Sequence, residues 1–253
     1  MARHANTGRS DKSHIGIRMR YLVLIALLAS IFGARADAHP YTAELDQLAT
    51  KNDLLGELIQ RVNQPRDLEE MRVGLDWLKA RSISGFGGSR ITFSYAGNLF
   101  RVGITDTASL ALLFGLLTSR IDAARCADPS APTEKLHRWD QALGPLVQHF
   151  RSLPIGQQHE LVLIAISMED KFSSRGPDVW MCSGGLAFMN KFFQKHKNNP
   201  NPPAREVQDP SRIGRTIVLE DTDIKPDFVP DEQWKLSRQK IIANFAQQMV
   251  SVK

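Results

Sequence analysis

The sequence lacks any apolar segment long enough to cross a membrane. Its longest apolar run covers the twelve residues from Tyr21 to Phe32, whereas a transmembrane helix needs about 20. This absence argues against a polytopic membrane protein. The composition, with 42% hydrophobic and 23% charged residues among 253, is typical of a globular chain and argues against a disordered one.

Motifs that would hold a metal or a nucleotide are also missing. No HExxH or CxxC pattern occurs, so we expect no metal site. The glycine-rich segment from Gly85 to Arg90 lacks the last glycine of a dinucleotide fingerprint, and it is followed by residues typical of a strand instead of a helix. We therefore expect no cofactor.

What the sequence does contain, near its start, is the pattern of a secretory signal peptide. Arg18 and Arg20 precede the apolar run, and small residues follow it, with possible cleavage after Ala36 or Ala38. Residues 1–38 are thus predicted as a signal peptide, whose working start could be Met19. We expect a periplasmic or secreted protein with no stable membrane insertion after cleavage.

The positive charge of the chain is concentrated in this signal region. The full sequence has 32 basic and 27 acidic residues, but six basic residues and one acidic residue lie before Asp37. The rest of the chain carries 26 of each sign and has a net charge of zero. Net charge therefore gives no support to nucleic-acid binding.

Only two cysteines occur, Cys126 and Cys182. In an oxidising compartment two cysteines of one exported domain most often pair. We predict a disulfide between them that joins two helices.

The spacing of apolar residues predicts a mainly α fold: a compact multi-helix domain with one small β-hairpin. Residues 39–197 are expected to form the helical core, residues 198–230 an extended proline-rich arm, and residues 231–253 a C-terminal helix packed on the core. The hairpin is placed at residues 90–104, because β-branched and aromatic residues flank Gly97. A third strand, Thr216 to Leu219, could join it.

Cys182 is the first candidate for catalysis, because a cysteine at a helix start can have a lowered pKa and act as a nucleophile. The run Cys182-Ser183-Gly184 resembles the nucleophile segment of NlpC/P60-type cell-wall peptidases over about five residues. It departs from that pattern in its extra glycine, Gly185, and in having only His196 after the cysteine, on the same helix. A disulfide at Cys182 would exclude this role.

Glu169, Glu160 and His159 form the second candidate set. A helical cell-wall glycosidase needs a carboxylic acid with a raised pKa facing a cleft, and these residues lie along one apolar helix. The alternative is that they are solvated residues of that helix.

The sequence contains no complete catalytic set, and this favours a binding protein over an enzyme. We expect an exported helical protein that binds a protein partner, as an inhibitor, an immunity protein or an envelope assembly factor. Two alternatives stay open. One is a cell-envelope hydrolase using Cys182 or Glu169, and the other is a carrier whose apolar helices 107–121 and 161–168 line a ligand cavity.

Overall fold

The computed structural model describes residues 39–50, 55–171, 176–207, 216–219, 221 and 223–250. The predicted signal peptide, residues 1–38, lies outside the described residues. The chain divides into two units, residues 1–40 and 41–253, and the second contains the fold. Within the described residues there are eleven helices and one two-stranded sheet, so the prediction of a mainly α fold is confirmed.

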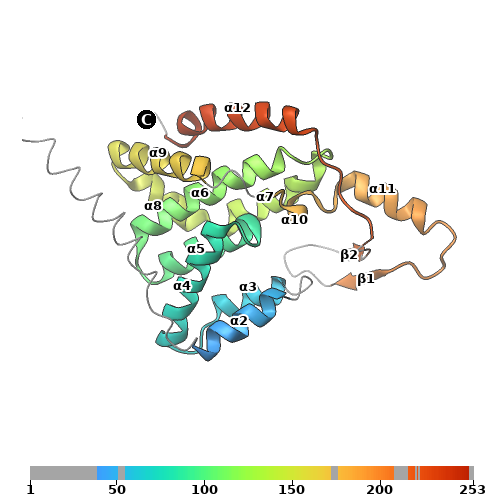
Figure 1. Cartoon of the computed structure of the whole chain (residues 1–253), viewed down its shortest axis with the longest axis horizontal. Coiled ribbons are helices and arrows are strands. Elements are labelled where there is room, and N and C mark those ends of the chain that lie inside the picture. The colour runs from blue at the N-terminus through green and yellow to red at the C-terminus, as the bar shows by residue number, and fades with distance from the viewer. Residues whose placement is uncertain are drawn as a thin grey trace, which may run out of the picture. The chain divides into compact units, whose positions relative to one another are not determined.

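The elements follow one another along the chain as shown in Figure 1. The helices are α2 (Pro40–Thr50), α3 (Leu55–Asn63), α4 (Leu68–Ser84), α5 (Gly88–Arg101), α6 (Thr105–Ala123), α7 (Ser130–Ala142), α8 (Gly144–Ser152), α9 (Ile155–Lys171), α10 (Val179–Cys182), α11 (Gly185–Lys195) and α12 (Asp231–Met249). The strands are β1 (Ala204–Val207) and β2 (Thr216–Leu219).

The hairpin predicted at residues 90–104 is wrong, because most of this segment forms helix α5. Its β-branched and aromatic residues are buried on a helix instead of a sheet, with Ile91 and Phe93 at 0% and 1% exposure. Phe93 packs closely on α6 because Gly115 has no side chain: a Cβ there would lie 2.6 Å from the phenyl ring. Gly97, predicted as the turn, has open space around it inside the helix. Packing therefore overrides the local β propensity.

The strand expected at Thr216–Leu219 exists, but its partner differs from the predicted one. It pairs antiparallel with Ala204–Val207, and Ala204 lies opposite Leu219. Both strands belong to the segment expected as an extended arm, residues 198–230. The arm therefore forms its own small ribbon.

Helix α6 lies at the centre of the main apolar cluster. It packs against α8, α9 and α12 through a set of buried side chains: Leu113, Phe114, Leu117, Ile121, Phe150, Leu161, Val162, Ala165 and Phe245. In Figure 1, α12 runs along α9 and α6. The apolar helices considered above as cavity walls, 107–121 and 161–168, thus pack against each other and against α12.

Candidate functional site

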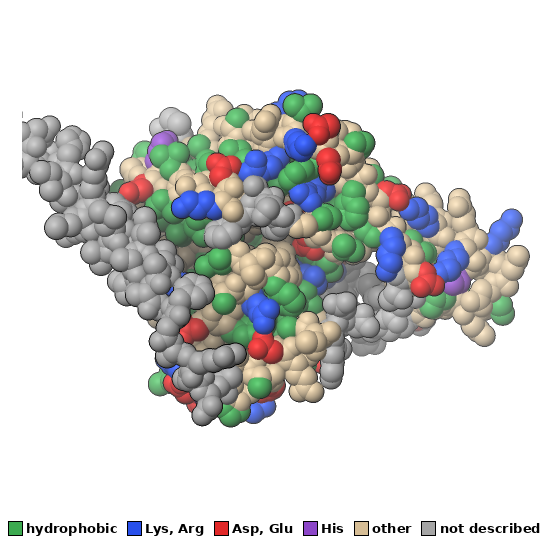
Figure 2. Space-filling view, in the orientation of Figure 1, with side chains coloured by type: hydrophobic (Ala, Val, Ile, Leu, Met, Phe, Trp, Pro, Cys, Tyr) green, Lys and Arg blue, Asp and Glu red, His purple; other side chains and the backbone are tan. Residues whose placement is uncertain are grey.

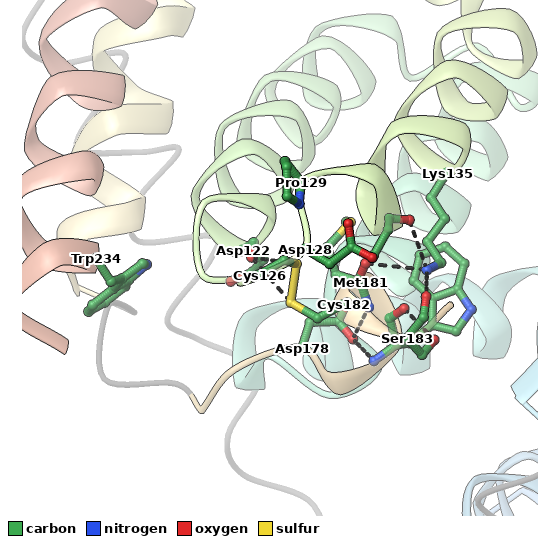
Figure 3. Close-up of a disulfide and its surroundings, with 12 residues drawn as sticks. Asp122, Cys126, Asp128, Pro129, Lys135, Asp178, Met181, Cys182, Ser183 and Trp234 are labelled. Carbon is green, nitrogen blue, oxygen red and sulfur yellow. Dashed lines mark hydrogen bonds between the residues drawn. A yellow bond between two sulfur atoms is a disulfide. The ribbon is translucent and has the colours of Figure 1, made fainter. Parts of the chain in front are cut away.

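The disulfide predicted between Cys126 and Cys182 is present, and it joins the turn after α6 to the end of α10 across 56 positions of sequence. Both cysteines are buried, and Figure 3 shows the bond with its neighbours. There is no free cysteine in the part of the chain that the structure describes. Cys182 in this disulfide has no thiolate to act as a nucleophile.

Asp128, at the turn before α7, fixes the start of α11. Its carboxylate accepts hydrogen bonds from the N–H of Ala187 (2.7 Å) and from the N–H of Ser130 (2.9 Å). The Ser130 hydroxyl and these N–H groups hold the pKa of Asp128 below its usual range. Gly185 is required here, because its φ is +77° and a Cβ would lie 2.6 Å from the carboxylate.

Lys135 of α7 fixes the α10 end of the short connection between α10 and α11. Its ammonium group donates to the carbonyl oxygens of Met181 (3.3 Å) and Ser183, next to the disulfide in Figure 3. Burial lowers the pKa of Lys135 to about 8, while Asp178 acts in the opposite direction. The α10–α11 connection is therefore held by the disulfide to the turn after α6, by the Asp128 carboxylate and by the Lys135 ammonium group of α7.

A cavity of about 250 Å³ opens between the glycine-rich turn before α5 and the segment before α10. Arg90 of α5 lines it, with its guanidinium carbon 4.3 Å from the ring centroid of Trp180. Burial lowers the pKa of Arg90 to about 10. Within the described residues Arg90 has neither a hydrogen bond nor an ion pair, and its Nε is buried.

Asp178 lines the same cavity. One carboxylate oxygen accepts the N–H of Trp180 (3.0 Å) at the start of α10. The other is buried without a hydrogen-bond partner, so close to Gly88 that a Cβ there would lie 2.1 Å away. Burial raises the pKa of Asp178, while Arg90 acts in the opposite direction.

Helix α11 has one buried side and one exposed apolar side. Phe192 is 1% exposed, whereas Leu186, Met189 and Phe193 are 64%, 41% and 58% exposed. The spacing of these three residues puts them on one face of the helix. They form what we call the α11 face.

Acidic residues of the arm bind α11 and its C-terminal end through side chains that do not belong to the α11 face. Lys191 pairs with Asp227 (2.7 Å), and Asp221 accepts from both Lys195 (2.9 Å) and His196 (2.7 Å). The Lys195 ammonium, followed by His196, lowers the pKa of Asp221 to about 2. These contacts tie α11 to the arm through charge-assisted hydrogen bonds.

The structure does not bring the predicted carboxylate set together. Glu160 and Glu169 are nine residues apart on α9, which puts them on opposite sides of the helix and about 13 Å apart along it. The Glu169 side chain is 1% exposed and pairs with Arg238 of α12. His159 is exposed, and neither Glu160, Glu169 nor His159 lines the cavity beside Arg90.

No sequence pattern identifies the residues grouped around this cavity, which are Arg90, Asp178, Lys135 and Trp180. They come from segments up to about 90 positions apart, and Arg90 was assigned to a strand. The sequence features closest to them are the glycine-rich turn, which directly precedes Arg90, and Cys182, which follows Trp180 by two positions. Only the fold brings these two segments together.

Known proteins provide no identification for this chain. It matches no protein-family model, and no curated protein or solved structure is significantly similar to it. Among the described residues, no helix is long and apolar enough to cross a membrane. The same residues contain no group of three or more His, Cys, Asp or Glu side chains placed to hold a metal ion.

Proposed function

We propose that this chain is an exported protein, periplasmic or secreted, that binds a protein partner through the α11 face. The observation that carries the proposal is the exposure of Leu186, Met189 and Phe193 on one side of a helix fixed by the disulfide region. Three large apolar side chains on one exposed face are typical of a helix that packs into an apolar groove.

The charges on and next to α11 are mostly paired within the chain. Residues 185–197 contain three lysines and no acidic residue, and Figure 2 shows Lys and Arg side chains lying among Asp and Glu side chains at the end of the helical unit that carries α11. Of these lysines, Lys191 and Lys195 are paired with carboxylates of the arm, while Lys197 lies beyond the helix end. The charge of α11 is therefore largely balanced within the chain, and we expect the partner to offer an apolar groove to the α11 face.

The anchoring of α11 favours binding. Asp128 and Lys135 fix the connection before α11, and the arm fixes its other end through Asp221. A helix ordered before binding loses less conformational entropy on association than a flexible segment does. This supports a docking role for α11 itself.

The partner proposal is tested by photo-crosslinking from α11 in the host. Benzoylphenylalanine at position 193 should give an adduct with a second protein, while the same group at Leu236, a 61% exposed residue of α12, should not. With the purified partner, Leu186→Asp and Phe193→Asp should each weaken binding at least about tenfold, since losing burial of an apolar side chain costs 1.4 kcal/mol or more.

The matched control is Leu236→Asp, which should bind like the unmodified protein. Circular dichroism should show the same helix content for all three variants. An adduct containing only a second copy of this chain would contradict the proposal, and so would equal loss of binding in the Leu236→Asp variant.

Export is tested separately by N-terminal sequencing of the protein recovered from the host envelope or medium. We expect the mature chain to begin at Asp37 or His39. Recovery of the uncleaved chain from the cytoplasm with both cysteines reduced would contradict export while leaving the α11 face to its own test.

A further inference from the structure

We propose that the cavity beside Arg90 binds a small molecule with one carboxylate and an apolar body. This site is separate from the α11 face, and the argument for it is independent of the partner. It rests on a guanidinium group without a hydrogen-bond or ion-pair partner among the described residues, a helix N-terminus without a capping side chain of its own, and apolar side chains that line the same cavity.

Arg90 is placed to bind a carboxylate. Its guanidinium group lies over the Trp180 ring, and within the described residues its side chain makes no hydrogen bond or ion pair. Asp178 of the same cavity attracts it only from beyond ion-pair distance. Leaving a half-buried cation without a partner costs free energy. A planar guanidinium group binds a carboxylate through two parallel hydrogen bonds, so a bound carboxylate would satisfy donors that the protein leaves unpaired.

The N-terminus of α5 supports the same ligand charge. Gly87 is the N-cap and offers no capping side chain, and the first turn contains no acidic residue. Gly87 and Gly88 both have positive φ and line the cavity. The Gly88 N–H donates to the Gly85 carbonyl oxygen (3.2 Å), and the Asp178 carboxylate lies against Gly88, so it is the helix dipole at this end that adds to the attraction of a negative group. Arg90 lies in the same first turn.

The two carboxylates of the cavity limit the ligand to a single negative charge. One carboxylate oxygen of Asp178 accepts a hydrogen bond from the N–H of Trp180 at the start of α10, and the other is buried against Gly88. Asp122, which is 3% exposed, also lines the cavity. The Asp178 carboxylate would repel a doubly charged phosphate more strongly than a singly charged carboxylate. The Lys135 ammonium group lies 5.2 Å from the centroid of the Trp180 ring and adds positive charge near it.

Four apolar side chains also line this small cavity: Leu48, Ala49 and Leu55 from α2 and α3, together with Phe86. A volume of about 250 Å³ is below the range of about 300–1,000 Å³ of drug-sized pockets. The site therefore fits a short branched acid or the C-terminal residue of a peptide, which share the same chemistry.

Calorimetric titration of the host-purified, disulfide-bonded protein tests the ligand class. We expect N-acetyl-leucine, 3-methylbutanoate or both to bind, and N-acetyl-leucinamide, which lacks the charge, to bind at least about tenfold more weakly than N-acetyl-leucine. Tighter binding of N-acetyl-leucine assigns the site to peptide C-termini, and tighter binding of 3-methylbutanoate assigns it to free acids. Binding of neither acid, or tighter binding of inorganic phosphate, would overturn the proposal.

Substitution of Arg90 locates the binding. Arg90→Gln should weaken the binding of whichever of the two acids binds by at least about tenfold. The control is Arg125→Gln, since Arg125 lies over Trp234 at 3.6 Å in a similar stack outside the cavity, and it should leave affinity unchanged. If Arg90→Gln does not fold, Arg90→Lys serves instead, because it keeps the positive charge but loses the planar guanidinium group that can donate two parallel hydrogen bonds. Unchanged affinity in the folded Arg90 variant would overturn the assignment.

Discussion

Replacing both Cys126 and Cys182 with serine should lower the free energy of unfolding by about 4 kcal/mol, the value expected for cross-linking a loop of this length. The loop spans 56 positions and contains α7, α8, α9 and α10. Without the bond, the unfolded chain gains the freedom that the cross-link removes. Urea unfolding of the two proteins under the same conditions measures the difference.

The loss of order should be local before it is global. The bond fixes α10 beside the end of α6, and α11 follows directly, whereas the cluster of α6, α9 and α12 is held by its own apolar contacts. Hydrogen exchange should therefore quicken most in α10 and α11. Reduction of the unmodified protein should reproduce both effects. A change below about 1 kcal/mol, or faster exchange spread evenly over α6 and α9, would contradict this role of the disulfide.

The helical character of the fold could be predicted because it follows from local spacing. Apolar residues of α4, α6 and α9 recur at three- and four-residue steps, and Pro145 marks the change from α7 to α8. The disulfide could be predicted because two cysteines in an exported domain leave one pairing. Neither inference needs knowledge of distant contacts.

The hairpin prediction at residues 90–104 is wrong because contacts distant in sequence determine the structure of this segment. Ile91 and Phe93 prefer strands when considered alone, and Gly97 suggests a turn. Their helical state depends on burial against α6, where Gly115 makes room for Phe93. A residue 22 positions away decides the structure of this segment, and no local pattern contains that information.

The same reason explains why the cavity could not be predicted. Arg90 becomes a candidate binding residue only because Trp180 lies beside it and no described carboxylate forms an ion pair with it. Both features depend on how α5 meets the segment before α10. By contrast, Glu169 attracted attention as an acidic residue at the end of an apolar helix. Its burial and its pairing with Arg238 give it a structural explanation that sequence could not supply.

Replacing Arg238 with methionine should lower the free energy of unfolding by about 3 kcal/mol, because it leaves the buried Glu169 carboxylate without its guanidinium partner. Glu169 is 1% and Arg238 18% exposed, and Arg238 also binds Asp170 at 2.9 Å. The pair joins α9 to α12 at the edge of the main apolar cluster. Thermal and urea unfolding measure the loss.

The double variant separates a structural role of Glu169 from a catalytic one. Changing Glu169 to leucine together with Arg238→Met removes both charges, and replacing a buried pair by apolar groups is often neutral, so stability should return to within about 1 kcal/mol of the unmodified protein. The control is Arg138→Met, which breaks only an exposed pair with Glu134 and should cost under about 0.5 kcal/mol. Partner binding through the α11 face should survive in the double variant. Loss of function in that stable, folded protein would contradict a purely structural Glu169, because the only change left would be the missing carboxylate and its guanidinium partner.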